Sequence, residues 1–194
     1  MFLIDDAIAR IDLEWAMRAV SDERRAQARR FRREADRRGS LAAYLLLRRA
    51  LREGYGIDEM PVLVYNQHGK PSLAGHPDLH ISLSHSEGAV AVAVDTAPVG
   101  IDIEMLALPE PGVVAFTMSE GERELISHAD DPAVQFVTLW TMKESLLKMT
   151  GEGLRDDMRT VLADSDYYQF DVIRRAHHVC TMCSPRHSSI TCPE

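Results

Sequence analysis

Cysteine is scarce in this sequence of 194 residues, and its scarcity excludes a disulfide framework. Only three cysteines are present, and all of them lie in the last fifteen residues. A chain of this length buries about 70% of its unfolded surface without cross-links. The content of 45% hydrophobic and 27% charged residues is ordinary for a globular protein. We therefore expect a core that is held together by apolar packing.

Long apolar runs and a basic leader are absent as well. No stretch is long and apolar enough to span a membrane. Residues 1–6, Met-Phe-Leu-Ile-Asp-Asp, carry no positive side chain of the kind that opens a secretory signal. We therefore expect a cytoplasmic protein that makes no use of a membrane.

Positive charge is in short supply, because the formal net charge is −8. This balance argues against a general nucleic-acid-binding protein, and we expect no nucleic acid as a partner. The exception is a block of eight arginines between Arg24 and Arg38. Such a block is usually a solvated helical face, and the alternative is an anion-binding site.

Lysine is the scarcer of the two basic residues. Only three of the 22 lysines and arginines are lysine, namely Lys70, Lys143 and Lys148. A sequence that uses arginine for generic positive charge keeps lysine where a compact ammonium is needed instead of a planar fork. Two of the three lie within residues 136–150, whose apolar pattern predicts a helix.

On that helix Trp140, Glu144 and Lys148 are spaced i, i+4, i+8 and share one face. One interpretation is an exposed pair of Glu144 and Lys148, which stabilises a helix by only about 0.2–0.5 kcal/mol. The other makes Glu144 a metal ligand and Lys148 a phosphate contact.

Residues 99–104, Val-Gly-Ile-Asp-Ile-Glu, predict a short strand. Because side chains alternate along a strand, Asp102 and Glu104 point to one side while Ile101 and Ile103 point into the core. Two carboxylates on one face repel each other unless a cation lies between them. A hard divalent metal with oxygen ligands satisfies this pattern, and the alternative is the solvent-facing side of an edge strand.

Four motifs follow one another along the chain and together carry a family resemblance. They are Gly69-Lys70-Pro71, Ser82-Leu83-Ser84-His85-Ser86, Gly100-Ile101-Asp102-Ile103-Glu104, and Trp140-Thr141-Met142-Lys143-Glu144-Ser145-Leu146-Leu147-Lys148. In this order and with these gaps they resemble the Sfp-type 4'-phosphopantetheinyl transferases. The resemblance extends over about residues 24–154.

The resemblance implies an α+β fold of two pseudo-twofold-related subdomains, each a small sheet packed with helices. We expect the subdomains to be residues 1–105 and 106–194, with the second one shortened. A linker with two prolines, residues 106–111, marks the boundary. Coenzyme A is expected in the cleft between the two halves.

The implied reaction is the Mg²⁺-dependent transfer of the phosphopantetheine arm of coenzyme A to a serine of an acyl or peptidyl carrier protein, with release of 3',5'-ADP. The implied metal ligands are Asp102, Glu104 and Glu144. Glu120 or Glu144 would accept the proton of the serine, and Lys148 would neutralise charge on the phosphate. The residues implied to contact coenzyme A are Arg24, Lys70, Ser84, His85, Lys143 and Lys148.

Two positions depart from the family pattern. Gly39 stands where the family usually has an arginine, and Gln27 stands at a position that is often basic. Both departures concern the 3'-phosphate of coenzyme A. The alternative function is therefore a catalytically retired relative that binds coenzyme A or a carrier protein without turnover. We expect a monomer in either case.

The remaining pattern predicts further elements. Ser21 is a helix cap, followed by a helix to about Phe31 or beyond, and Ser119 caps another that runs to about His128. Asp131-Pro132 begins the motif helix, and Gly151-Glu152-Gly153-Leu154 ends it. Other predicted elements are strands at 1–4, 61–66, 80–85, 167–173 and 178–184 and helices at 13–20 and 40–53, the last ended by Gly54 and Gly56. Residues 89–94 alternate small and β-branched side chains before the break at 96–98. Cys180, Cys183, His187 and Cys192 fall one residue short of a zinc-knuckle spacing, so idle or buried thiols are the preferred interpretation.

Overall fold

The structure is a computed structural model that describes residues 1–5, 11–107, 109–153 and 155–186. Its amino-terminal part forms an antiparallel three-stranded sheet in the order β1-β5-β4 and a separate hairpin of β2 and β3. The elements are β1 (Phe2–Asp5), α1 (Leu13–Arg18), α2 (Asp22–Ala28), α3 (Glu34–Tyr55), β2 (Leu63–Tyr65), β3 (Pro71–Leu73), β4 (His80–Ser86) and β5 (Ala89–Asp95).

The carboxyl-terminal part forms a second antiparallel sheet in the order β6-β8-β7. Its elements are β6 (Gly100–Met105), α4 (Pro111–Thr117), α5 (Glu120–Ser127), α6 (Pro132–Thr150), the short 3-10 turns η2 (Met158–Thr160) and η3 (Ser165–Tyr167), β7 (Tyr168–Arg174) and β8 (His178–Pro185). β6 precedes the predicted boundary after residue 105, yet it pairs with β8 of the second sheet.

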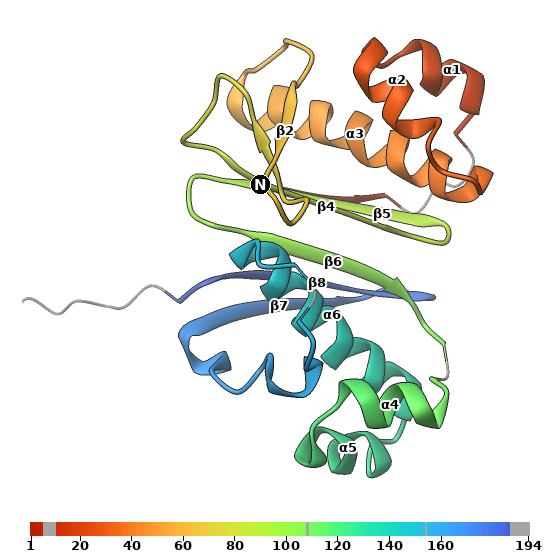
Figure 1. Cartoon of the computed structure of the whole chain (residues 1–194), viewed down its shortest axis with the longest axis vertical. Helices are drawn as coiled ribbons and strands as arrows, with labels where there is room; N and C mark the ends of the chain where they lie inside the picture. Colours follow the sequence, from red (N-terminus) through yellow and green to blue (C-terminus); the bar gives the residue numbers. More distant parts are fainter. Residues whose placement is uncertain (6–10, 108, 154, 187–194) are drawn as a thin grey trace, which may run out of the picture.

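The two sheets lie in the middle of the molecule, with helices on the outside (Figure 1). α3 covers the first sheet, with α1 and α2 packed on α3, and α6 covers the second, with α5 packed on α6. The predicted α+β class, with small sheets packed against helices, is confirmed. None of the described helices combines the length and the apolar character that a membrane span requires.

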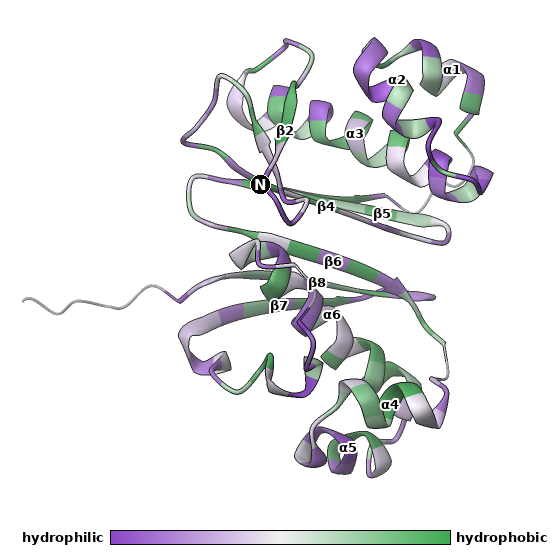
Figure 2. Cartoon of the chain, viewed as in Figure 1, coloured by the Kyte–Doolittle hydropathy of each residue, from purple (hydrophilic) through white to green (hydrophobic). Residues whose placement is uncertain are grey.

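The two faces of strand β5 belong to two different hydrophobic cores. Its valines, at positions 90, 92 and 94, pack with the apolar side of α3. Its alanines, at positions 89, 91 and 93, pack against Ile101 and Ile103 of β6. Because alanine is small, β6 approaches this face closely. Figure 2 shows β6 itself alternating between hydrophobic and hydrophilic positions along its length.

The helix that begins after Ser21 ends at Ala28, and not at Phe31 or beyond as predicted. Ser21 does cap it, by accepting a hydrogen bond from the backbone N–H of Arg24. The chain turns at residues 29–33, where Arg37 donates to the carbonyl of Phe31. The ring of Phe31 also meets that of His85 edge-on at 6.3 Å between centroids. This tertiary contact, which local propensity does not encode, places Phe31 outside the helix.

Other helix boundaries also differ from the prediction. α3 begins at Glu34 instead of Ser40, and Gly54 lies within its last turn, while Gly56, with φ +67°, forms the left-handed end. Only Pro111, the last residue of the predicted linker 106–111, is helical: it occupies the first position of α4, a helix that was not predicted. α6 begins at Pro132 and ends at Gly151 with φ +74°, as predicted.

The predicted closing strands are present as β7 and β8. Cys180 and Cys183 of β8 are both buried, in two different apolar clusters, so their side chains lie on opposite faces of the strand. Burial raises the pKa of the Cys183 thiol to about 12. His187 and Cys192 lie outside the described residues.

Gly100 is the point where α6 rests on β6. A β-carbon at this position would lie 1.9 Å from the carbonyl oxygen of Ser145 and 2.5 Å from the backbone nitrogen of Met149. Both atoms belong to the backbone of α6, so no side-chain rotation relieves the overlap. The absence of a side chain at Gly100 thus sets how closely the helix approaches the strand.

We predict that Gly100→Ala lowers the free energy of unfolding by about 3 kcal/mol or more, because the helix must move away from the strand. Urea denaturation would measure the loss. Gly121→Ala is the matched control, since Gly121 lies in α5 with nothing within 4 Å of an added β-carbon. Its replacement should stabilise the protein by about 1 kcal/mol through helix propensity. Equal unfolding free energies for Gly100→Ala and the wild type would contradict the close approach.

Candidate active site

Strand β4 meets β6 through serine side chains instead of a backbone ladder. Each of three alternate serines of β4 accepts a hydrogen bond from a backbone N–H of β6. The pairs are Ser82 with Ile101 at 3.0 Å, Ser84 with Ile103 at 3.4 Å and Ser86 with Met105 at 3.1 Å. The serines lie opposite the alanines of β5 in the first sheet, so one face of that sheet consists of small side chains.

The same serines hold the two carboxylates of β6. Ser84 donates its hydroxyl hydrogen to Oδ1 of Asp102 at 2.8 Å, and Ser86 donates to Oε2 of Glu104 at 3.0 Å. Asp102 is only 2% exposed. Its second oxygen, Oδ2, is buried without a hydrogen-bond partner among the described residues. An acidic oxygen in this position favours the binding of a cation.

Lys148 reaches this pair of strands from α6. Its Nζ lies 2.5 Å from Oδ1 of Asp102 and 3.0 Å from the hydroxyl of Ser84. Burial alone would lower the pKa of Lys148, but the charge and hydrogen bond of Asp102 outweigh it, and the pKa is raised. Lys148 is therefore a fixed ammonium. Its ion-pair partner is Asp102, so it is not simply half of an exposed pair with Glu144.

Glu104 and Glu144 complete an acidic cluster around Lys148. Burial, and after it the negative charge of Asp102, raises the pKa of each of these carboxyls. Three carboxyl groups thus face one ammonium, and their ionised forms repel each other. Such a set attracts a further cation.

The donor chemistry of the cluster suits a hard metal ion, since carboxylate oxygens are the ligands that Mg²⁺ prefers. The unpartnered Oδ2 of Asp102 fits the same purpose. Among the described residues, however, no three His, Cys, Asp or Glu side chains are arranged closely enough to hold a metal as they stand. Lys148 is the cation that Asp102 contacts in this arrangement.

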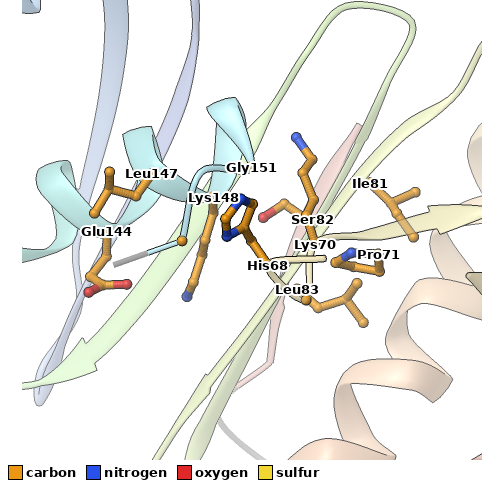
Figure 3. Close-up of a pocket in the computed structure, with 12 residues that line it drawn as sticks. His68, Lys70, Pro71, Ile81, Ser82, Leu83, Glu144, Leu147, Lys148 and Gly151 are labelled. Carbon is orange, nitrogen blue, oxygen red and sulfur yellow. The ribbon is translucent and has the colours of Figure 1, made fainter. Parts of the chain in front are cut away.

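A pocket of about 370 Å³ opens beside this cluster, between α6 and the amino-terminal part of the chain. Glu144 and Lys148 of α6 line one side, and Ser82 with its neighbours on β4 lines the other (Figure 3). Lys70, from the turn between β2 and β3, lines it as well. The predicted residues Lys70, Glu144 and Lys148 are therefore brought together.

The turn between β2 and β3 is bound to the end of α6. Nζ of Lys70 donates to the carbonyl of Met149 at 2.5 Å, and the side-chain amide of Asn66 donates to the carbonyl of Gly151 at 3.1 Å. Burial lowers the pKa of Lys70. These bonds satisfy carbonyls at the carboxyl end of the helix and close one end of the pocket.

A second pocket, of about 590 Å³, lies between the start of α3 and the β4–β5 turn. His85 and Gly39 line it, together with Arg33 and Arg38. Burial lowers the pKa of His85, and the charge of Lys148 adds to this effect. A β-carbon at Gly39 would lie 3.0 Å from the His85 ring, so an arginine at this position requires that ring to move.

Comparison with known proteins identifies the family to which this chain belongs. Residues 98–187 match the model of the 4'-phosphopantetheinyl transferase superfamily, and residues 9–97 match the model of a 4'-phosphopantetheinyl transferase N-terminal region. The chain is 36% identical over 144 residues to a 4'-phosphopantetheinyl transferase of Bacillus subtilis, which covers 71% of this chain and 63% of that protein. The chain belongs to the 4'-phosphopantetheinyl transferase superfamily.

Two other relatives give a similar picture. The chain is 36% identical over 154 residues to the 4'-phosphopantetheinyl transferase psf-1 of Bacillus pumilus, covering 78% of this chain and 66% of the relative. It is 32% identical over 154 residues to the 4'-phosphopantetheinyl transferase Sfp of Bacillus subtilis strain 168, covering 78% and 69%. The chain thus spans about two thirds of the length of these superfamily members.

Arg24, a residue that the superfamily resemblance assigns to coenzyme A, lies inside the protein. It is 8% exposed, and its guanidinium donates to the hydroxyl and the carbonyl of Ser40 and to the side chain of Gln27. Its carbon Cζ also lies 5.2 Å from the centre of the Tyr44 ring. Arg24 therefore joins α2 to α3 in this structure, and burial lowers its pKa.

Lys143 and Glu120 are not brought to either pocket. The ammonium of Lys143 is fully buried and bonded to Glu122 and to the carbonyl of Met158, on another side of α6 from Glu144. Glu120 is exposed at the start of α5 and does not line either pocket within the described part of the chain. This geometry therefore gives no support to the predicted coenzyme A contact of Lys143 or to the predicted proton-acceptor role of Glu120.

Sequence reasoning missed three residues that shape the site. Ser82 and Ser86 have the same role toward β6 as Ser84, and their alternate spacing was the available signal. Glu122 is the partner of Lys143. Its signal was the spacing of Ser119 and Glu122, which form a capping box at the start of α5.

We predict that Glu144→Gln raises the free energy of unfolding near pH 7. The pKa of Glu144 is raised above its ordinary value of 4.5, so the folded state binds more protons than the unfolded chain, and stability falls as the pH rises through the folded pKa. A neutral amide avoids that loss. The gain should disappear below about pH 4.5, where both states are protonated.

Thermal unfolding across this pH range would measure the effect of Glu144→Gln, with Glu120→Gln as the exposed control. A Glu144→Gln variant that is less stable than the wild type at neutral pH would show that the cluster gains more from Lys148 than it loses by repulsion.

Proposed function

We propose that this protein transfers the 4'-phosphopantetheine arm of coenzyme A to a serine of an acyl or peptidyl carrier protein and releases 3',5'-ADP. The observation that carries the proposal is the cluster of Asp102, Ser84 and Lys148 beside Glu104 and Glu144, in a chain of this superfamily. The carrier serine forms a bond from its oxygen to the β-phosphorus. The bond from that phosphorus to the leaving 3',5'-ADP breaks.

The residues of the cluster suit this chemistry. Phosphoryl transfer depends chiefly on positioning and on neutralising charge, and Lys148 supplies a fixed positive charge to the pyrophosphate. Glu144 accepts the proton of the serine, directly or through water, since it lines the pocket and burial, followed by the charge of Asp102, raises its pKa. Glu120, the other predicted acceptor, lies outside it.

Asp102, Glu104 and Glu144 are the residues that would hold Mg²⁺. When bound, Mg²⁺ supplies charge neutralisation to the pyrophosphate. In this proposal the pocket lies between the two halves 1–105 and 106–194. Lys70, Ser84 and His85 of the first half contribute to the donor site, and the halves act within one monomer.

The first experiment is mass spectrometry of several apo carrier proteins incubated with the protein, coenzyme A and Mg²⁺. A mass gain of one phosphopantetheine supports the transferase. Binding of coenzyme A by calorimetry without any mass gain would instead support a relative that has lost turnover.

We predict that Asp102→Asn lowers the transfer rate by about 10²–10³-fold and abolishes the Mg²⁺ dependence of coenzyme A binding, because it removes the anionic oxygens of one proposed Mg²⁺ ligand. Transfer assays and calorimetry with and without Mg²⁺ would measure both effects. Asp164→Asn, at an exposed position without a side-chain capping bond, is the matched control. Unchanged Mg²⁺ dependence in Asp102→Asn would remove Asp102 from the proposed ligand set.

We also predict that Lys148→Met loses about 10²-fold or more in rate, far beyond the effect of a surface ion pair. Lys148→Arg should recover only part of this rate, because a planar fork cannot replace a compact ammonium between Asp102 and Ser84. The measurement is the transfer rate at saturating coenzyme A. Wild-type rates in both variants would show that Lys148 has only a structural role.

A further inference from the structure

Outside the pocket, α6 carries a second lysine whose charge is completely buried. Lys143 is 0% exposed, and its Nζ donates to Oε2 of Glu122 and to the carbonyl of Met158, each at 2.8 Å. Glu122 is itself only 11% exposed. The pair is therefore an internal contact of the protein, shielded from solvent.

The partners of Lys143 come from different elements. Glu122 lies in the first turn of α5, where the same oxygen accepts the backbone N–H of Ser119 at 2.7 Å. Met158 begins the turn η2 and is buried in the cluster formed by Leu146, Leu147 and Met149 of α6. One ammonium thus ties together α5, α6 and the segment that follows α6.

A buried ion pair of this kind adds little by itself to the free energy of unfolding. The cost of removing both charges from water often equals the gain from their attraction, and apolar side chains of similar volume serve equally well. What directional bonds add is a defined position, because an ammonium held by two acceptors permits little rotation or sliding of its helix.

The position that Lys143 fixes is the rotation of α6 about its own axis. Successive residues of a helix point about 100° apart, so the direction of Lys143 determines that of Glu144, and Lys148 follows one turn later. On another side the backbone of α6 rests on Gly100. The strand sets the distance of the helix, whereas Lys143 sets its rotation.

We propose that Lys143, held by Glu122 and the carbonyl of Met158, is a positioning residue that aims Glu144 and Lys148 at the pocket. This inference rests on the proposed function. It differs from the role that the family resemblance implies for Lys143, because the side chain acts through α6 and does not touch coenzyme A. Glu122 thereby becomes part of the same device, although it lies on another helix.

The test compares Lys143→Met with the double variant Lys143→Met/Glu122→Leu. The double variant leaves no unpaired buried charge, so it folds even where a single substitution is costly. Ser119→Ala keeps the backbone N–H that contacts Glu122 and controls for the helix cap. Arg159→Met removes the exposed ion pair with Asp157 beside Met158 and controls for the loss of a charge in this region.

We expect the double variant to lose about tenfold to a hundredfold in kcat, because small displacements of catalytic groups have effects of this size. The dissociation constant of the double variant for coenzyme A should change by less than about threefold. Lys143→Met alone should have nearly the same kcat as the double variant, since the two residues act as one unit. Both controls should keep wild-type kcat. Calorimetry and transfer assays well below the unfolding temperature give these values.

Three results would overturn the inference. A double variant with wild-type kcat and only a lower unfolding temperature would make the pair purely structural. Lost affinity for coenzyme A at an unchanged kcat would make Lys143 a ligand contact instead. A wild-type protein without transfer activity would overturn the proposed function and this inference together, whereas the first two results leave the proposed function intact.

Discussion

The close approach of β6 to the first sheet is the contact on which the rest of the structure depends. Three serines of β4 and three alanines of β5 form a face of small side chains. Larger residues there would hold the sheets apart, and the serine hydroxyls would not reach the backbone of β6. Because they do reach it, the two sheets are joined by hydrogen bonds without sharing a backbone ladder.

The packing around β6 also brings two carboxylates together away from water. Asp102 and Glu104 lie on the face of β6 that α6 covers, opposite the isoleucines, and the serines of β4 border the strand, so both carboxylates lose water. The serine hydroxyls donate one hydrogen bond to each carboxylate, and the ammonium of Lys148 pairs with the negative charge of Asp102. The remaining negative charge favours a further cation at the cluster.

The three lysines show why arginine would not replace them. Lys70 ends at the carbonyl of Met149, Lys143 is enclosed between Glu122 and Met158, and Lys148 lies between Asp102 and Ser84. The ammonium groups of Lys143 and Lys148 each have two acceptors from different elements, which suits a compact donor better than a planar fork. The composition indicated this distinction, although it did not indicate which lysine met which partner.

The sequence by itself determined the alternation of β4, β5 and β6, the ends of α6 at Pro132 and Gly151, and the cap of α5. These features depend on side-chain period and local hydrogen bonds, which a short stretch carries in full. Only the tertiary structure decided that Arg24 and Lys143 are buried, that Glu120 lies away from the pocket and that Lys148 pairs with Asp102. Long charged side chains reach several neighbours, and which neighbour is present depends on how distant elements pack.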